Sequence, residues 1–123
     1  MKSRILSILP LFLFGVLMSA QAYARAPFRD VAAKAYPNAA KTLLSCKLCH
    51  EGTNFKQRNP YGMDFEKAAK DAGYPSNADA LSAAFKAIEK IDSDGDTVSN
   101  IDEINKGTFP GDKNSHPVLS ELE

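Results

Sequence analysis

The segment Cys46-Lys47-Leu48-Cys49-His50 constrains this chain more than any other part of its sequence. Two thiols three positions apart on a helical turn can each add to a vinyl group of one porphyrin, and the histidine that follows is then held beneath the iron as an axial ligand. The chain has 2 cysteines, so this motif uses both. It predicts one covalently attached haem c, with Cys46 and Cys49 as attachment residues and His50 as the proximal iron ligand.

Three other uses of the two thiols agree less well with the sequence. A thioredoxin-like redox pair has the same spacing but lies in a βαβ unit, and no strand pattern precedes Cys46. A structural zinc site needs four ligands and would have to recruit the distant His116. A disulfide that closes so short a loop adds little stability. Haem attachment is therefore the favoured interpretation.

The first 24 residues have the features of a secretory signal peptide. Lys2 and Arg4 form a basic start, an apolar run follows, and the small-residue triplet Ala22-Tyr23-Ala24 offers a cleavage site. A cut two residues earlier and an uncleaved membrane anchor are the alternatives, although polar and helix-breaking residues interrupt the apolar run. We expect residues 1–24 to be removed. Residues 25–123 then form one domain, periplasmic or secreted, without membrane contact.

The exported part has the capping and breaking residues of four short helices, and no stretch alternates like a strand. The expected spans are 30–50 with a break at Pro37, 60–73, 77–90 and 100–106. The predicted N-caps are Asp30, Asn38, Asn59 and Ser99, and the predicted stops are Gly73 and Gly107. We expect an all-α bundle of about four short helices around one covalently attached haem.

Two of these helices carry a single apolar stripe at helical spacing, which predicts the residues that face the core. In the second helix the stripe consists of Tyr61, Phe65, Ala68 and Ala72, and in the third of Leu81, Ala84, Phe85 and Ile88.

The sixth position of the iron has two strong candidate ligands in the exported part, His116 and Met63. Met63 lies about 200° round its helix from Tyr61, so we expect it to face away from the core. His116 lies in an irregular tail that is able to fold back over the haem or to remain in solvent. The sequence favours His116 as the distal ligand. Met63 and a vacant, water-filled or partner-supplied position are the alternatives.

A second motif, residues 92–103, places oxygen-bearing groups around a twelve-residue loop. Ca2+ is bound by oxygens spaced in this way, from carboxylates, a backbone carbonyl and a terminal glutamate. The predicted calcium ligands are Asp92, Asp94, Asp96, the carbonyl of Val98, Asn100 and Glu103. Thr97 departs from the pattern, because it stands at the sixth position, where a sharp turn favours glycine. The predicted ion is structural, and a solvated acidic turn that caps the last helix is the alternative.

The order of these motifs resembles that of small bacterial monohaem c-type cytochromes. The likeness covers residues 43–117 and rests on the haem motif, on Asn59-Pro60-Tyr61-Gly62 and on the segment 91–112, which is similar to a bacterial thrombospondin type 3 calcium repeat. It implies a small cytochrome c-like fold and periplasmic or extracellular electron transfer, with the haem and calcium residues in the roles given above. It leaves the distal ligand open.

No catalytic triad, acid and base pair or nucleotide-binding loop is recognisable in the sequence. We therefore expect an electron-transfer protein and not an enzyme, one that exchanges single electrons with redox partner proteins in the exported compartment. A haem enzyme or gas-binding sensor with an open iron site is one alternative. A subunit of a polymerising cytochrome assembly is another, and the oligomeric state stays open.

The formal net charge of zero argues against a nucleic-acid partner. This balance hides two regions of opposite sign. Residues 25–90 carry 11 basic and 7 acidic side chains, whereas residues 91–123 carry 2 and 8. The basic, haem-bearing region suits acidic redox partners, and a bound Ca2+ would reduce the acidic excess.

Overall fold

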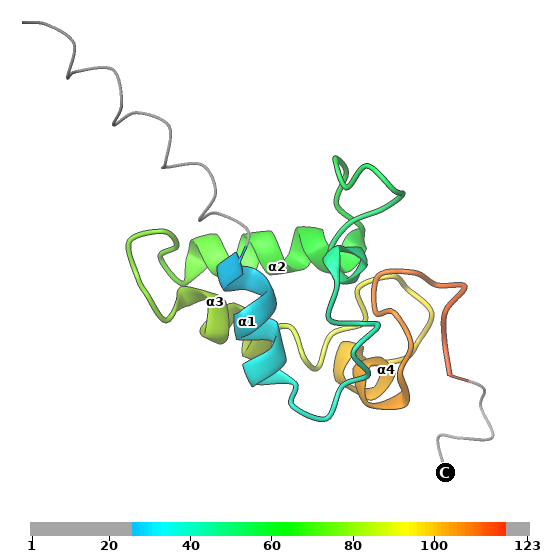
Figure 1. Ribbon diagram of the computed structural model, residues 1–123. Helices are drawn as coiled ribbons and strands as arrows, with labels where there is room; N and C mark the ends of the chain where they lie inside the picture. Colours follow the sequence, from blue (N-terminus) through cyan, green and yellow to red (C-terminus); the bar gives the residue numbers. More distant parts are fainter. Residues whose placement is uncertain (1–25, 118–123) are drawn as a thin grey trace, which may run out of the picture.

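In the computed structural model, which describes residues 26–117, every regular element is helical. The elements are α1 (Ala26–Ala35), the 3₁₀ turn η1 (Cys46–Leu48), α2 (Pro60–Asp71), α3 (Ala80–Ala87) and α4 (Asn100–Lys106), as Figure 1 shows. Within these residues no strand forms, and His50 and Arg58 make an isolated bridge. The all-α prediction is confirmed. The predicted signal peptide, residues 1–24, lies outside the described residues.

The helix predicted over residues 30–50 is wrong in its bounds. Helix α1 begins at Ala26, so Asp30 lies inside it and is not its cap, and it ends at Ala35. Pro37 has no N–H to donate and disfavours a helical conformation in the residue before it. Beyond it the chain forms separate turns, such as the one closed by Leu43 N and Ala40 O at 2.9 Å. Asn38 therefore starts no helix.

The start of α2 agrees with the prediction. The Asn59 side chain accepts a hydrogen bond from Gly62 N at 2.8 Å, and Pro60 occupies the first helical position, where the missing N–H costs nothing. The helix ends at Asp71, and Gly73 follows it with a φ of 93°, a conformation that glycine adopts without strain.

Helix α4 also forms as expected, between Ser99 and Gly107. The Ser99 side chain accepts from Asp102 N, and Gly107 ends the helix in the left-handed conformation. Helix α3 is shorter than the predicted 77–90. Asn77 accepts from Asp79 N at 3.0 Å and donates to Ala72 O at 2.9 Å, so its side chain stabilises the turn after α2 instead of capping α3.

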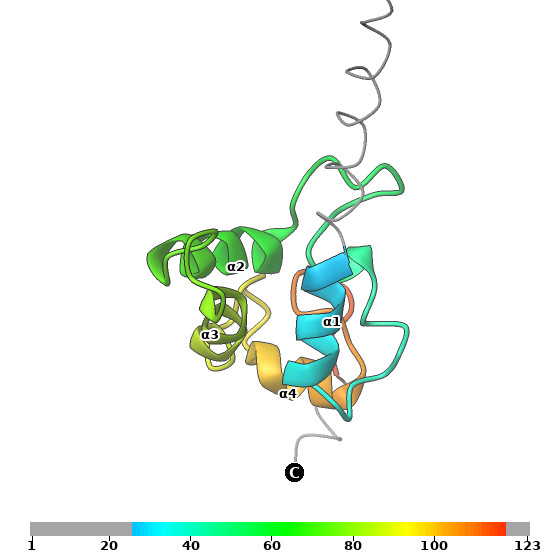
Figure 2. The same ribbon diagram turned by 60° about the vertical axis from the view of Figure 1, so that its left-hand side comes forward.

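The core lies where α2 and α3 run side by side and α1 packs against α3, which Figure 1 and Figure 2 show from two directions. Its buried members are Ala32, Tyr36, Leu48, Tyr61, Phe65, Ala69, Leu81, Ala84, Phe85, Ile88 and Ile104. The predicted stripe of α3 is buried throughout. In α2 the buried alanine is Ala69, whereas Ala68 and Ala72 are half-buried. The helix therefore sits slightly rotated relative to the stripe read from the sequence.

The segments that carry the predicted chemistry lie between the helices. The haem motif belongs to residues 36–59 between α1 and α2. The acidic loop, residues 92–103, begins between α3 and α4 and ends in α4, which contains Asn100 and Glu103. After α4 the chain returns toward the haem motif, where Gly111 lies against the side chain of Asn59. Among residues 26–117, none of the helices has the length and hydropathy needed to cross a bilayer.

Candidate functional site

The haem motif forms a single tight turn. Leu48 N donates to Ser45 O at 3.1 Å, and His50 N donates to Cys46 O at 3.0 Å, so the backbone wraps once and brings the residues of the motif onto one turn. Leu48 is buried in the core and anchors the turn. Cys46 is exposed, Cys49 is half-buried, and both thiols are free. Both predicted attachment residues are therefore unbonded and lie on the turn that leads into His50.

The imidazole of His50 is oriented by the loop that follows it. His50 Nδ1 lies 3.1 Å from the carbonyl oxygen of Gln57, which also accepts from Glu51 N at 3.0 Å. A carbonyl oxygen can only accept, so this bond requires the proton on Nδ1 and leaves the lone pair on Nε2. Metal-binding histidines are commonly held in this way by a second group. Two free thiols and an oriented imidazole on one turn fit a covalently attached haem.

The surroundings of the two cysteines do not support a thiol redox pair. Burial raises the pKa of the Cys49 thiol to about 12, although the nearby Arg58 opposes the shift. Cys49 therefore stays protonated at neutral pH and is not the reactive thiolate that such a pair requires. The helical surroundings also lack the strand that such a motif follows, within the part of the chain that the structure describes.

The zinc alternative also lacks support among the described residues. Of their His, Cys, Asp and Glu side chains, Asp92, Asp94 and Asp96 form the group of three whose ligand atoms lie within 4.8 Å of one another. Cys46, Cys49, His50 and His116 do not gather into such a group, so the structure does not assemble a Cys2His2 centre from them.

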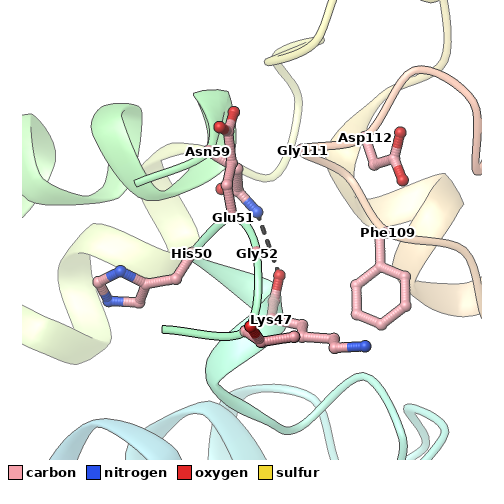
Figure 3. Close-up of a pocket in the computed structure, with 9 residues that line it drawn as sticks. Lys47, His50, Glu51, Gly52, Asn59, Phe109, Gly111 and Asp112 are labelled. Atoms are coloured by element: carbon pink, nitrogen blue, oxygen red, sulfur yellow. Dashed lines mark hydrogen bonds between the residues drawn. The ribbon is translucent and has the colours of Figure 1, made fainter. Parts of the chain in front are cut away.

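A pocket of about 480 Å³ lies between the haem motif and the segment after α4 (Figure 3). Lys47 and Asn59 line one side, and Phe109 and Asp112 line the other. Figure 3 shows the His50 ring pointing away from Phe109 and Asp112. His50 is itself one of the residues that line this pocket.

The two predicted distal ligands are both exposed side chains. Met63 is 56% exposed on α2, as its position on the helix predicts. His116 is exposed near the end of the described residues, and its Nδ1 lies 3.2 Å from Pro117 O. Neither side chain is committed to the core, so both remain accessible as ligands.

The acidic loop is folded around its own carboxylates. Asp92 accepts from Gly95 N at 2.8 Å through Oδ1 and from Thr97 N at 2.8 Å through Oδ2. Burial works against ionisation, but these backbone N–H groups together with that of Asp96 lower the pKa of Asp92. Asp96 Oδ1 accepts from Val98 N at 2.8 Å. Hydrogen bonds within the loop thus hold the carboxylates of Asp92 and Asp96 in place.

Four buried carboxylate oxygens in this region have no hydrogen-bond partner. They are Asp94 Oδ2, Asp96 Oδ2 and both oxygens of Glu103. Glu103 is 0% exposed, and burial raises its pKa to about 8, with further increases from Asp94, Asp96, Asp92 and Asp112. Burying a carboxylate without a partner is costly, so natural sites pair such groups or place them on a metal. The donor set consists of hard oxygens and fits Ca2+.

Thr97 adopts the backbone conformation that its position in a calcium loop demands. Its φ is 80°, in the left-handed region that a β-branched residue rarely enters, and Gly95 has a φ of 81°. The departure from glycine in the sequence therefore leaves the turn itself in place. Its cost is local strain, on the order of 1–3 kcal/mol for a residue held in such a region.

Asn100 and Val98 have different surroundings from the aspartates. The buried amide of Asn100 donates to Ile88 O at 2.7 Å and to Ser93 Oγ at 2.9 Å, and its oxygen accepts from Ser93 N at 3.2 Å. It thus joins the two ends of the loop. The Val98 side chain is buried, and its backbone N–H donates to Asp96 Oδ1 within the acidic loop.

Two residues matter to the haem motif in ways that the sequence did not reveal. The dipeptide Asn59-Pro60 indicated a helix cap but not that the Asn59 amide also donates to Lys47 O and Leu48 O, both at 3.1 Å. Gly111 had no recognised role, yet it packs directly on that amide. No local pattern could have identified this contact, because the two residues are far apart in the chain.

The chain matches no protein-family model, no curated protein and no solved structure.

Proposed function

We propose that this protein is a small, exported monohaem c-type cytochrome that carries single electrons between redox partners. The observation that carries the proposal is the state of the haem motif: His50 is fixed through Nδ1 by Gln57 O, with two free thiols on the same turn. When bound, the haem supplies the one-electron chemistry of its iron.

Each residue of the motif has a defined task in this proposal. Cys46 and Cys49 attach the group covalently, and His50 presents the lone pair of Nε2 to the iron. Half-burial of Cys49 and the buried Leu48 place one side of the motif on the apolar core, which excludes water there. Burial of this kind tunes a redox potential. Because Cys46 is exposed, a haem attached here would be reached by redox partners from the side of Cys46.

We further propose that residues 92–103 bind one structural Ca2+. Support comes from the unpartnered buried oxygens of Asp94 and Asp96 in the loop and of Glu103 in α4, and from the loop backbone, which already has the required turn at Thr97. A cation would compensate the repulsion between these buried carboxylates and fix α4 relative to α3. The role is structural, because the loop joins two helices of the bundle.

The decisive experiment is a visible spectrum of the exported protein, recorded oxidised and reduced, together with a test of whether the haem stays attached after denaturation. Covalent attachment and sharp reduced bands are expected. Their absence from correctly exported protein would overturn the proposal.

The same sample distinguishes the carrier from an enzyme or sensor with an open iron site. A carrier with a sixth ligand binds CO or cyanide slowly or weakly, whereas rapid stoichiometric binding indicates an open site. Replacing His116 or Met63 with Ala then identifies the distal ligand, since the substitution that removes it changes the reduced spectrum and the midpoint potential.

A further inference from the structure

The side chain of Asn59 is nearly enclosed, with 4% of its surface exposed, and it links two elements. Its Nδ2 donates to Lys47 O and to Leu48 O, both at 3.1 Å and both within the haem motif. Its Oδ1 accepts from Gly62 N at 2.8 Å, in the first turn of α2. Both amide hydrogens and the amide oxygen are therefore used, and buried groups of this kind are costly to leave unpaired.

The backbone around Asn59 reinforces the same contact. Asn59 N donates to Cys49 O at 3.1 Å. A Cβ atom at Gly62 would collide with that carbonyl oxygen, so only glycine allows α2 to lie this close to Cys49. The start of α2 and the end of the haem motif are consequently packed backbone against backbone.

A third element covers the amide from outside. A Cβ atom on Gly111 would lie 2.6 Å from Asn59 Cγ and 2.7 Å from Oδ1, which means that the segment after α4 presses on the side chain. That segment is tied to the acidic loop, because Thr108 N donates to Glu103 O at 2.9 Å. Asn59 thus lies where the haem motif, α2 and the C-terminal segment meet.

From these contacts we infer that Asn59 is a positioning residue for the iron ligand His50, in addition to capping α2. The inference rests on the proposed haem function. Two amide donors hold the carbonyls of the turn that precedes His50, and the backbone N–H holds the carbonyl of Cys49. Serine or aspartate can cap a helix equally well, but neither has the two donors. The position therefore requires asparagine for a reason that capping alone does not explain.

The test compares Asn59→Ser with Asn77→Ser in the exported, haem-loaded protein. Asn77 is a matched control, because its amide also donates to a backbone carbonyl and accepts from a backbone N–H, but it is exposed and belongs to the turn after α2. Neither change alters charge, and serine retains the capping oxygen at position 59.

Two measurements report on the motif itself. In Asn59→Ser, amide hydrogen exchange over residues 46–50 should accelerate about tenfold, as expected for the loss of two buried hydrogen bonds. The midpoint potential should fall, because a looser motif admits water that stabilises the ferric charge. In Asn77→Ser both should equal the wild-type values.

A second variant covers the case in which Asn59→Ser fails to fold. Gly111→Ala removes no hydrogen-bond donor or acceptor from the chain but forces a methyl group against the Asn59 amide, and it should produce the same two changes to a smaller extent. The positioning role is wrong if the folded variant, Asn59→Ser or Gly111→Ala, gives the same hydrogen exchange over residues 46–50 and the same midpoint potential as Asn77→Ser. If wild-type protein carries no covalent haem, the proposed function fails instead, so the two failures are distinct.

Discussion

The two chemistry-bearing segments of this protein differ in how well their polar groups are satisfied. In residues 46–59, the His50 ring, the Asn59 amide and the backbone carbonyls of the turn all have partners within the chain. In residues 92–103, one buried oxygen of Asp94, one of Asp96 and both of Glu103 have none. The polar groups of the first segment are held by hydrogen bonds within the chain, whereas the second segment buries carboxylate oxygens that the chain leaves without a partner.

This difference predicts how each segment depends on its cofactor. The haem motif should keep its conformation without haem, because the buried Asn59 amide and the carbonyls of Lys47, Leu48 and Cys49 are hydrogen-bonded within the chain. A loop with four unpartnered carboxylate oxygens should lose stability without a cation, since the buried charges repel one another and are poorly solvated.

Replacing both cysteines of the motif should have the largest effect and should be confined to one segment. The double variant Cys46→Ser, Cys49→Ser should lose covalent haem completely, measured as haem retained after denaturation. Calcium affinity, measured by calorimetry, should remain at the wild-type value, because Asp92–Glu103 is untouched. A parallel loss of calcium binding would show that the two segments do not fold separately and would break the comparison.

Removing the buried glutamate should affect the other segment. Glu103→Gln should weaken Ca2+ binding by on the order of 100-fold, because residues that merely orient metal ligands already change affinity about 10–100-fold. Asp102→Asn is the control, since this neighbouring carboxylate is exposed. Equal calcium affinity in the two variants, measured by calorimetry on chelator-treated protein, would contradict the assignment of Glu103.

Without calcium, stability should fall as the pH rises. Burial raises the pKa of Glu103 from 4.5 to about 8, so between these values the folded chain holds a proton that the unfolded chain has released. Across this range a rising pH favours the unfolded chain, which has already released the proton, so the free energy of unfolding falls. The decrease ends above about pH 8, where the folded chain is deprotonated as well. The thermal midpoint should drop by at least about 4–8 °C across this range, the shift that 1 kcal/mol produces in a small domain.

Two controls show whether Glu103 is the titrating group. Glu103→Gln and saturating Ca2+ should each flatten the dependence, the first by removing the titrating group and the second by neutralising it. A slope that persists in Glu103→Gln would assign the effect to another residue.

The smallest expected effect comes from the strained turn of the acidic loop. Thr97→Gly should relieve the positive φ of 80° and raise the free energy of unfolding by about 1 kcal/mol, with Ca2+ or without it, because the turn is already formed by the chain alone; denaturant unfolding measures this change. Thr53→Gly, in an exposed part of the loop after the haem motif, should show no such gain. A loss of affinity in Thr97→Gly would mean that the threonine itself contributes to the site.

Prediction from sequence succeeded where the signal is local. Asn59-Pro60 and Ser99 mark helix starts whose capping bonds form within three residues, and the apolar stripe of α3 is buried as its spacing indicates. It failed over residues 30–50, where an alanine-rich composition suggested helix on both sides of Pro37. There the buried Leu43 and Leu48 hold a chain of turns, because contacts with the core outweigh helix propensity.

Local sequence patterns account for the chemistry available to this protein: the spacing of Cys46, Cys49 and His50, the acidic residues 92–103, and the caps that define α2 and α4. These are properties of neighbouring residues, which short-range geometry converts into turns and helices. Only the tertiary structure decided that Glu103 is buried without a partner and that Gly111 closes over Asn59. Burial and long-range contact depend on how distant segments pack, and no local pattern encodes them.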